Sequence, residues 1–176
     1  MKSPAAASRE EEKRQLSLLL CMESSTPSRD TERAMPAESE FLRAFREGFE
    51  QGNRAWNAGD VKTAYAVLPD RLEYQLAPTW PDARVLGSRD EVIEFFESFQ
   101  ETFPDARTAS SEYLEGGPGT VIVGFRVTGT GRTSGAKAEM EIWQVWAIPD
   151  QDELTVRSVR EFTNRREALE AAGLSE

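Results

Sequence analysis

Histidine is absent from the 176-residue sequence, and cysteine occurs once, at Cys21. Without histidine the chain has no Ser-His-Asp or Cys-His nucleophile system, no HExxH zinc site and no imidazole for acid–base catalysis. A single cysteine excludes an intrachain disulfide, a CxxC redox motif and a cysteine-rich zinc site. The DxDxDG pattern of a calcium-binding loop is missing too. We therefore expect no metal and no other cofactor.

Positive charge is also scarce. The sequence has 21 Lys and Arg against 31 Asp and Glu, which gives a net charge of -10. Binding to a nucleic-acid backbone needs a basic face, and this composition does not favour one. Nowhere does an apolar stretch approach the ~20 residues of a membrane span. The sequence predicts an acidic, cytoplasmic protein that binds neither nucleic acid nor a membrane.

Residues 1–37 differ from the rest in composition. They hold six basic and six acidic residues, so the whole net charge belongs to residues 38–176. The segment is otherwise mostly Ser, Ala, Thr and Pro, with one short apolar run at 16–22. Such a segment buries too little apolar surface to offset the entropy lost on ordering. We predict a disordered tail over 1–37 and one domain over 38–174.

Three helices are predicted in the first half of this domain. Aromatic residues and one glycine recur at steps of three and four over 41–56, which is the stripe of an amphipathic helix. A short helix is predicted over 61–68. A third, rich in Phe, is predicted over 88–103, where Ser88 and Glu91 form a capping box. We expect the Phe stripes in the core rather than around a cofactor.

Alternating apolar and polar residues predict five strands, over 72–76, 108–115, 120–130, 138–148 and 154–162. Two prolines in 77–87 predict a loop, and Asn164 with Glu167 forms a capping box for a C-terminal helix. Helices segregated from a run of antiparallel strands indicate an α+β fold. We expect a strongly bent antiparallel sheet whose concave face is capped by the N-terminal helices, with a pocket at the open end.

Four segments resemble a known family: WNAGD at 56–60, LEYQLAPTWPDARVLGSRDEVIEFF at 72–96, IWQVWAI at 142–148 and REFTNRREALEAAGL at 160–174. The chain resembles the SnoaL-like branch of the NTF2-like superfamily, which includes ketosteroid-isomerase-like proteins and polyketide cyclases. The last segment is the most specific, because a strand that runs into a capped ALEAAGL helix is common in this group. The resemblance covers about 38–174 and implies a cone-shaped α+β domain. It implies no single activity, since one fold hosts many functions.

The resemblance also bears on catalysis. Catalytic relatives use a pocket carboxylate or histidine helped by Tyr, Asp or Arg, and the isomerases combine an Asp base with Tyr and protonated Asp donors. Here Asn164 stands where the cyclases have an acid–base Asp, and Gln144 stands where SnoaL-like relatives often have His. Because an amide does not exchange a proton near neutral pH, the resemblance implies a pocket without a strong acid–base.

The predicted ligand-binding residues are Tyr74, Trp80, Phe96, Gln144, Trp146 and Asn164. Gln144 lies among large apolar residues and needs hydrogen-bond partners, from a ligand, a water, Tyr74 or Arg160. Asn164 is first of all a helix N-cap. Five charged residues are either pocket groups or paired and solvated surface groups: Asp82, Arg84, Arg157, Arg160 and Glu161.

The candidates for catalysis are Glu141, Tyr74 and Arg126. Tyr74 either donates to a ligand carbonyl or packs in the core with its hydroxyl bonded at the rim. Arg126 either binds an anion in the pocket or pairs across the sheet with Glu139 or Glu141. A glutamate beside Trp143 either has a raised pKa and acts as a base, or lies on the outer sheet surface.

Three functions follow from these alternatives. The first, which we predict, is binding of a small apolar or aromatic molecule in the cone pocket. The second is an isomerase, cyclase or epoxide hydrolase with Glu139, Glu141 or Glu161 as its carboxylate. The third is a non-catalytic interaction domain whose cone is filled by its own aromatic side chains. Tryptophans on both faces of strand 138–148 further predict a homodimer through the sheet.

Overall fold

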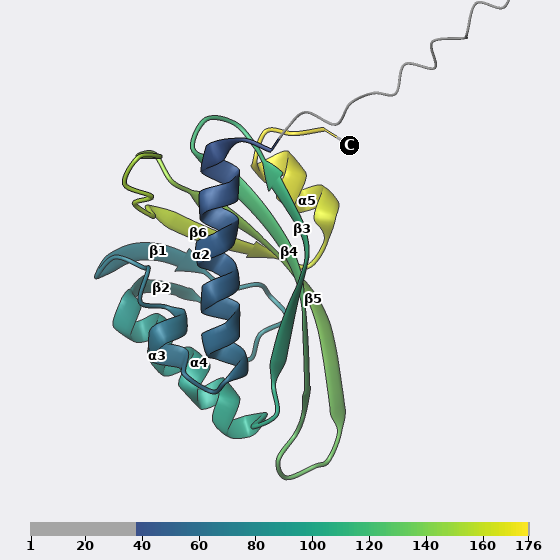
Figure 1. The fold of residues 1–176 in the computed structure, drawn as a ribbon. Coiled ribbons are helices and arrows are strands. Elements are labelled where there is room, and N and C mark those ends of the chain that lie inside the picture. Colours follow the sequence, from purple (N-terminus) through teal and green to yellow (C-terminus); the bar gives the residue numbers. More distant parts are fainter. Residues whose placement is uncertain (1–37, 176) are drawn as a thin grey trace, which may run out of the picture. The chain divides into compact units, whose positions relative to one another are not determined.

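A computed structural model describes residues 38–175 of the protein, so the predicted tail lies outside the described residues. Six strands form one sheet in the order β2-β1-β6-β5-β4-β3 (Figure 1). They are β1 (Arg71–Gln75), β2 (Val85–Ser88), β3 (Arg107–Glu115), β4 (Thr120–Thr130), β5 (Lys137–Ala147) and β6 (Ser158–Phe162). The helices are α2 (Glu40–Asn57), α3 (Val61–Ala64), α4 (Arg89–Thr102) and α5 (Arg165–Ala171). The α+β class is therefore confirmed.

Local capping explains where the helices begin. The Ser39 hydroxyl accepts a hydrogen bond from the Leu42 amide at 3.0 Å and starts α2. The Ser88 hydroxyl does the same for α4, accepting from the Glu91 amide at 3.3 Å. A side-chain oxygen at this position pairs an amide that the helix itself leaves unpaired. Helix α2 ends before Gly59, whose φ of 84° suits a glycine.

Strand register decides which side chains face the helices. Gln144 of β5 lies opposite Glu161 of β6, so both side chains point to the same face. Trp146 lies opposite Val159, which in turn lies opposite Tyr74 of β1. Tyr74, Gln144, Trp146 and Glu161 therefore share one face of the sheet, the inner face, whose apolar residues pack with those of α2, α3 and α4.

The region between β1 and α4 corrects the prediction of a loop over 77–87. Its last residues form the edge strand β2, which pairs antiparallel with β1, Leu86 opposite Tyr74. Leu86 is fully buried, and this burial favours a strand that the nearby prolines do not reveal. The strands pair antiparallel as predicted, except that β1 and β6 pair in parallel.

Two predicted elements are too long. Helix α3 ends at Ala64 rather than residue 68, because the Ala66 and Leu68 amides bond to carbonyls three residues back and tighten the chain into turns. Strand β6 begins at Ser158 rather than residue 154, because Leu154 adopts a φ of 50° after a turn and cannot continue a strand.

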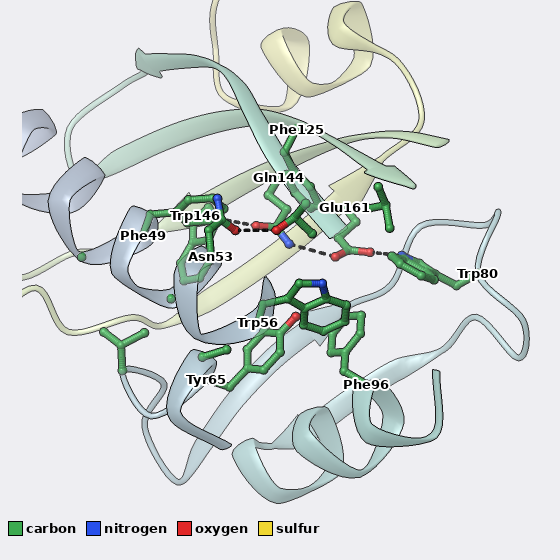
Figure 2. A pocket seen from close by; sticks show the side chains of 16 residues that line it. Phe49, Asn53, Trp56, Tyr65, Trp80, Phe96, Phe125, Gln144, Trp146 and Glu161 are labelled. Carbon is green, nitrogen blue, oxygen red and sulfur yellow. Dashed lines mark hydrogen bonds between the residues drawn. The ribbon is translucent and has the colours of Figure 1, made fainter. Parts of the chain in front are cut away.

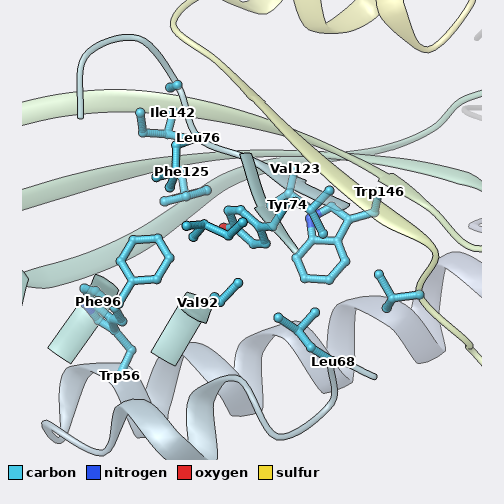
Figure 3. Packing of buried hydrophobic residues seen from close by; sticks show 14 of the residues in the cluster. Trp56, Leu68, Tyr74, Leu76, Val92, Phe96, Val123, Phe125, Ile142 and Trp146 are labelled. Carbon is cyan, nitrogen blue, oxygen red and sulfur yellow. The ribbon is translucent and has the colours of Figure 1, made fainter. Parts of the chain in front are cut away.

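The core has two parts on the two faces of the sheet. The inner part packs aromatic and aliphatic side chains of α2 and α4 against β1, β4, β5 and β6 (Figure 3). The smaller outer part consists of Ile122, Trp143 and Val145 packed against α5 residues Ala168 and Leu169. The sequence placed tryptophans on both faces of β5. The structure assigns Trp143 to the outer face and Trp146 to the inner one.

Candidate functional site

A pocket lies between α2 and the inner face of the sheet (Figure 2). The centre of a water-sized sphere can occupy about 60 Å³ of the pocket. This volume is several times the ~10–15 Å³ that one water needs. Seven of the lining side chains are aromatic: Phe49, Trp56, Tyr65, Trp80, Phe96, Phe125 and Trp146. The cone is therefore not filled by its own aromatic side chains.

Small residues form one edge of the pocket. Gly48 and Gly52 of α2 lie there with Ala64 of α3 and with Val67. Val67 lines the pocket although 60% of its surface is exposed, so this edge opens to solvent. Beyond the helix's own backbone, a Cβ atom at Gly48 would meet no atom of residues 38–175 within 4 Å, whereas at Gly52 it would lie 3.0 Å from the Ala64 carbonyl oxygen. Gly48 therefore stands at the mouth with room for a larger side chain.

Figure 2 shows Glu161 between Gln144 and Trp80, and its side chain belongs to a residue that is only 3% exposed. Its Oε1 accepts hydrogen bonds from the Tyr74 hydroxyl at 2.8 Å and from Gln144 Nε2 at 2.9 Å. Its Oε2 accepts from the Ala77 amide at 3.1 Å and from Trp80 Nε1 at 2.5 Å. Four donors thus converge on one buried carboxylate.

The direction of each hydrogen bond follows from groups that can only donate. Trp146 Nε1 donates to Gln144 Oε1 at 3.0 Å, which turns the Gln144 amide nitrogen toward the Tyr74 oxygen, at 2.8 Å, and toward Glu161. The Tyr74 oxygen accepts this bond and its own proton goes to Glu161. Because a carboxylate has about four acceptor positions, the four donors occupy them all. This arrangement matches the ionised form of Glu161.

Burial governs the titration of this group. It raises the pKa of Glu161 above its ordinary value, and hydrogen bonds from Gln144, Ala77, Tyr74 and Trp80 act in the opposite direction. Burial also raises the pKa of Tyr74 and Tyr65 well above the usual range, and the Glu161 charge adds to the effect. Both tyrosines are therefore neutral near pH 7. Neither lysine nor arginine occurs among the residues that line the pocket.

Trp56 contributes a donor without an acceptor. Its side chain lines the pocket and is 4% exposed, yet Nε1 has no hydrogen-bond partner among the described residues. Burying an unpaired donor costs ~1–3 kcal/mol. The indole N–H is therefore a group that an acceptor in the pocket would satisfy.

Four of the residues predicted to bind a ligand line this pocket, namely Trp80, Phe96, Gln144 and Trp146. Tyr74 is fully buried and is not one of the lining residues, but its hydroxyl bonds to two of them, Glu161 and Gln144. Asn164 lies outside it. Its side chain accepts from the Glu167 amide at 2.9 Å and caps α5.

The role of Asn164 can be tested separately. We expect Asn164→Ala to lower the free energy of unfolding by ~1 kcal/mol through the lost cap, and Asn164→Asp to retain it. Urea denaturation of both variants measures this difference. Neither variant should change ligand binding, and a binding defect with unchanged stability would contradict the capping role.

The catalytic candidates do not come together. Glu141 is exposed and accepts from Trp143 Nε1 at 3.1 Å on the outer face. Arg126 pairs with Glu139, Nε to Oε1 at 3.3 Å, and both are exposed. Glu161 is the carboxylate that lies in the pocket. Of the loop residues, Asp82 and Arg84 are exposed and do not line it.

Sequence reasoning missed several lining residues, above all Asn53, Trp56 and Tyr65. One signal was available, since Asn53 is a polar residue between Phe49 and Trp56 on the apolar stripe of α2. Asn53 bonds to the hydroxyls of Ser110 and Thr108 on β3, at 2.8 and 3.1 Å. For Tyr65 there was no signal, because its position depends on the turns that follow α3.

Within residues 38–175, the acidic side chains form no group of three or more that could hold a metal ion. In the same part of the chain, none of the helices has the length and apolar character needed to cross a membrane.

Solved structures with this fold are similar in shape and distant in sequence. An NTF2-like protein of unknown function from Burkholderia pseudomallei is 19% identical, with a TM-score of 0.56, over 77% of this chain and 98% of that one. A putative isomerase from Bacillus subtilis is 12% identical, with a TM-score of 0.60, over 77% and 96%. A Catenulispora acidiphila protein of ketosteroid isomerase-like fold, in complex with trimethylamine, is 9% identical, with a TM-score of 0.56, over 73% and 93%.

A comparison with curated proteins gives no match. The family model of the SnoaL-like domain matches residues 41–157, which include α2, α4 and five of the six strands. The match covers well over half of the chain and agrees with the fold of the solved structures. The protein belongs to the SnoaL-like family.

Proposed function

We propose that the protein binds a small, largely apolar or aromatic molecule in the pocket between α2 and the sheet. The observation that carries this proposal is an open, aromatic-lined pocket with the indole N–H of Trp56, which has no hydrogen-bond partner in the described part of the chain. Ligand pockets are typically apolar and hold a few polar groups that orient the ligand. Trp56 supplies such a group here, because its indole N–H has no partner among the described residues.

Catalysis is the second candidate, and Glu161 is the residue that supports it. A buried carboxylate with a raised pKa is the usual form of a general base or acid. A base must also direct a free lone pair at the substrate, and all four acceptor positions of Glu161 are taken. The saturated carboxylate therefore favours binding over isomerase, cyclase or epoxide hydrolase chemistry.

A homodimer through the sheet and a cytoplasmic location remain proposals. The outer face supports the dimer, because beside the α5 contact it carries Phe162, which is partly buried, and the exposed pair Arg126–Glu139. Opposite charges on one face can pair across a two-fold axis. Light scattering measures the mass directly, and a monomer would overturn this part.

Gly48 offers a direct test of pocket binding. We expect some small apolar or aromatic compounds to raise the melting temperature of the full chain. A ligand at a concentration of 100 times its Kd adds ~2.7 kcal/mol to the free energy of unfolding. Gly48→Leu places a branched side chain at the mouth and should abolish these shifts while the fold stays intact. The matched control Gly48→Ala should retain them and raise stability by up to ~1 kcal/mol, because alanine favours the helix. Equal shifts in Gly48→Leu, or none with any compound, would contradict the proposal.

A further inference from the structure

The pocket combines two features that its apolar character does not explain. One is a buried carboxylate, Glu161, with no lysine or arginine among the lining residues to balance it. The other is the density of aromatic rings around it. Phe96 lies at the centre of this group, with ring centroids 5.0 Å from Tyr65, 5.3 Å from Trp56 and 5.5 Å from Trp80.

Aromatic rings and an uncompensated negative charge both attract a cation. The face of an aromatic ring carries partial negative charge, and cages of Trp, Tyr and Phe recognise quaternary ammonium groups. A carboxylate in a site shielded from water adds a stronger attraction than it would in solvent. The net charge of -10 on the chain further raises the local concentration of cations.

We propose that the preferred ligand is a small N-methylated ammonium compound that also carries a hydrogen-bond acceptor. This inference rests on the proposed function and names its ligand class. Methylation matters because the four donors leave Glu161 no acceptor position for an ammonium N–H. A methylated ammonium needs no such position, since it interacts through charge and with ring faces.

The acceptor matters because of Trp56. Its buried Nε1–H lacks a partner among the described residues, and a cation alone would leave it unpaired. A hydroxyl or carbonyl oxygen beside the ammonium group would accept this hydrogen bond. The pocket is large enough for only a small molecule, so the two groups must lie close together in the ligand.

Choline and its neutral carbon isostere 3,3-dimethylbutan-1-ol test this directly. They have the same shape and hydroxyl and differ in charge. Titration calorimetry of the full chain, at matched ionic strength with sodium chloride, should show choline binding on the order of tenfold more tightly or better, as expected for a desolvated cation–π contact. Tetramethylammonium should bind more weakly than choline, because it offers Trp56 no acceptor.

Two substitutions test whether Glu161 causes the preference for choline. Glu161→Gln should reduce the preference for choline over the alcohol, while Glu141→Gln, with the same loss of charge on the outer face, should retain it. The wild-type comparison decides the matter if Glu161→Gln does not fold. Two outcomes would overturn the cation inference and leave the proposed function standing. One is equal binding of choline and the alcohol. The other is that only neutral compounds bind and that Gly48→Leu abolishes their binding. Failure of every compound to bind would overturn both.

Discussion

Glu161→Gln is expected to lower the free energy of unfolding by roughly 2–3 kcal/mol at neutral pH. Glutamine has one acceptor oxygen, so its amide nitrogen must face donors that now bond to the carboxylate. Gln144 cannot turn to accommodate it, because Trp146 Nε1 holds the Gln144 oxygen. Charge-assisted hydrogen bonds are also replaced by weaker neutral ones.

Urea denaturation measures this loss, and Glu73→Gln is the control. Glu73 lies on the neighbouring strand β1 and is exposed, so the same substitution should change stability by less than ~0.5 kcal/mol. A Glu161→Gln protein as stable as the wild type would show that the four donors do not depend on the carboxylate.

The raised pKa of Glu161 also predicts how the difference in stability between wild type and Glu161→Gln depends on pH. The folded state binds this proton more tightly than the unfolded state, whose carboxyl has its ordinary pKa of 4.5. The resulting stabilisation is fully present below that pH and is lost as the pH rises through the folded pKa. Tyr65 and Tyr74, the titratable groups that face Glu161, stay neutral throughout. The stability advantage of wild type over Glu161→Gln should therefore shrink with rising pH and then level off. An advantage that grows with pH would contradict a raised pKa.

Phe96→Ala is expected to cost ~3–5 kcal/mol, the usual range for removing a buried aromatic ring. The Phe96 ring is 2% exposed and contacts Trp56, Tyr65, Tyr74 and Trp80. Its loss would leave a cavity continuous with the pocket, and the surrounding rings are too rigid to close it. Thermal and urea denaturation both report the change.

Phe95→Ala is the matched control, one residue away on the same helix. The Phe95 side chain is partly exposed and packs between Trp80, Phe96 and the Arg84 guanidinium. We expect Phe95→Ala to lower the free energy of unfolding by about half as much as Phe96→Ala, because the Phe95 side chain buries less apolar area on folding. Equal losses for the two variants would show that the ring cluster is less tightly packed at Phe96 than its contacts indicate.

Local sequence signals predicted the helices and their N-caps well. Ser88 and Asn164 cap where the capping boxes indicate, because a cap depends on residues within one turn. Edge strand β2 was not predicted, since its stability comes from burial of Leu86 against β1 and not from its own pattern. The parallel pairing of β1 with β6 joins segments more than 80 residues apart and has no local signature.

The site was predictable only in part, because its geometry also depends on contacts between segments that are distant in the sequence. Gln144 was correctly expected to need partners, and Tyr74 is one of them. The sequence offered three glutamates as pocket carboxylates, and alternation alone did not distinguish Glu161 from the two on β5. The β5–β6 register makes that distinction by placing Glu161 opposite Gln144. That Trp56 Nε1 lacks an acceptor within residues 38–175 is likewise a property of the packed structure.

The indole N–H signals of the four tryptophans provide the most direct test of ligand binding in this pocket. In a ¹H–¹⁵N spectrum of the full chain, assigned with Trp→Phe variants, we would titrate the tightest-binding compound to saturation. The Trp56 signal should shift most, because its N–H gains an acceptor, while that of Trp143 on the outer face should stay in place. A shift at Trp143 with Trp56 unchanged would place the ligand elsewhere and contradict the account.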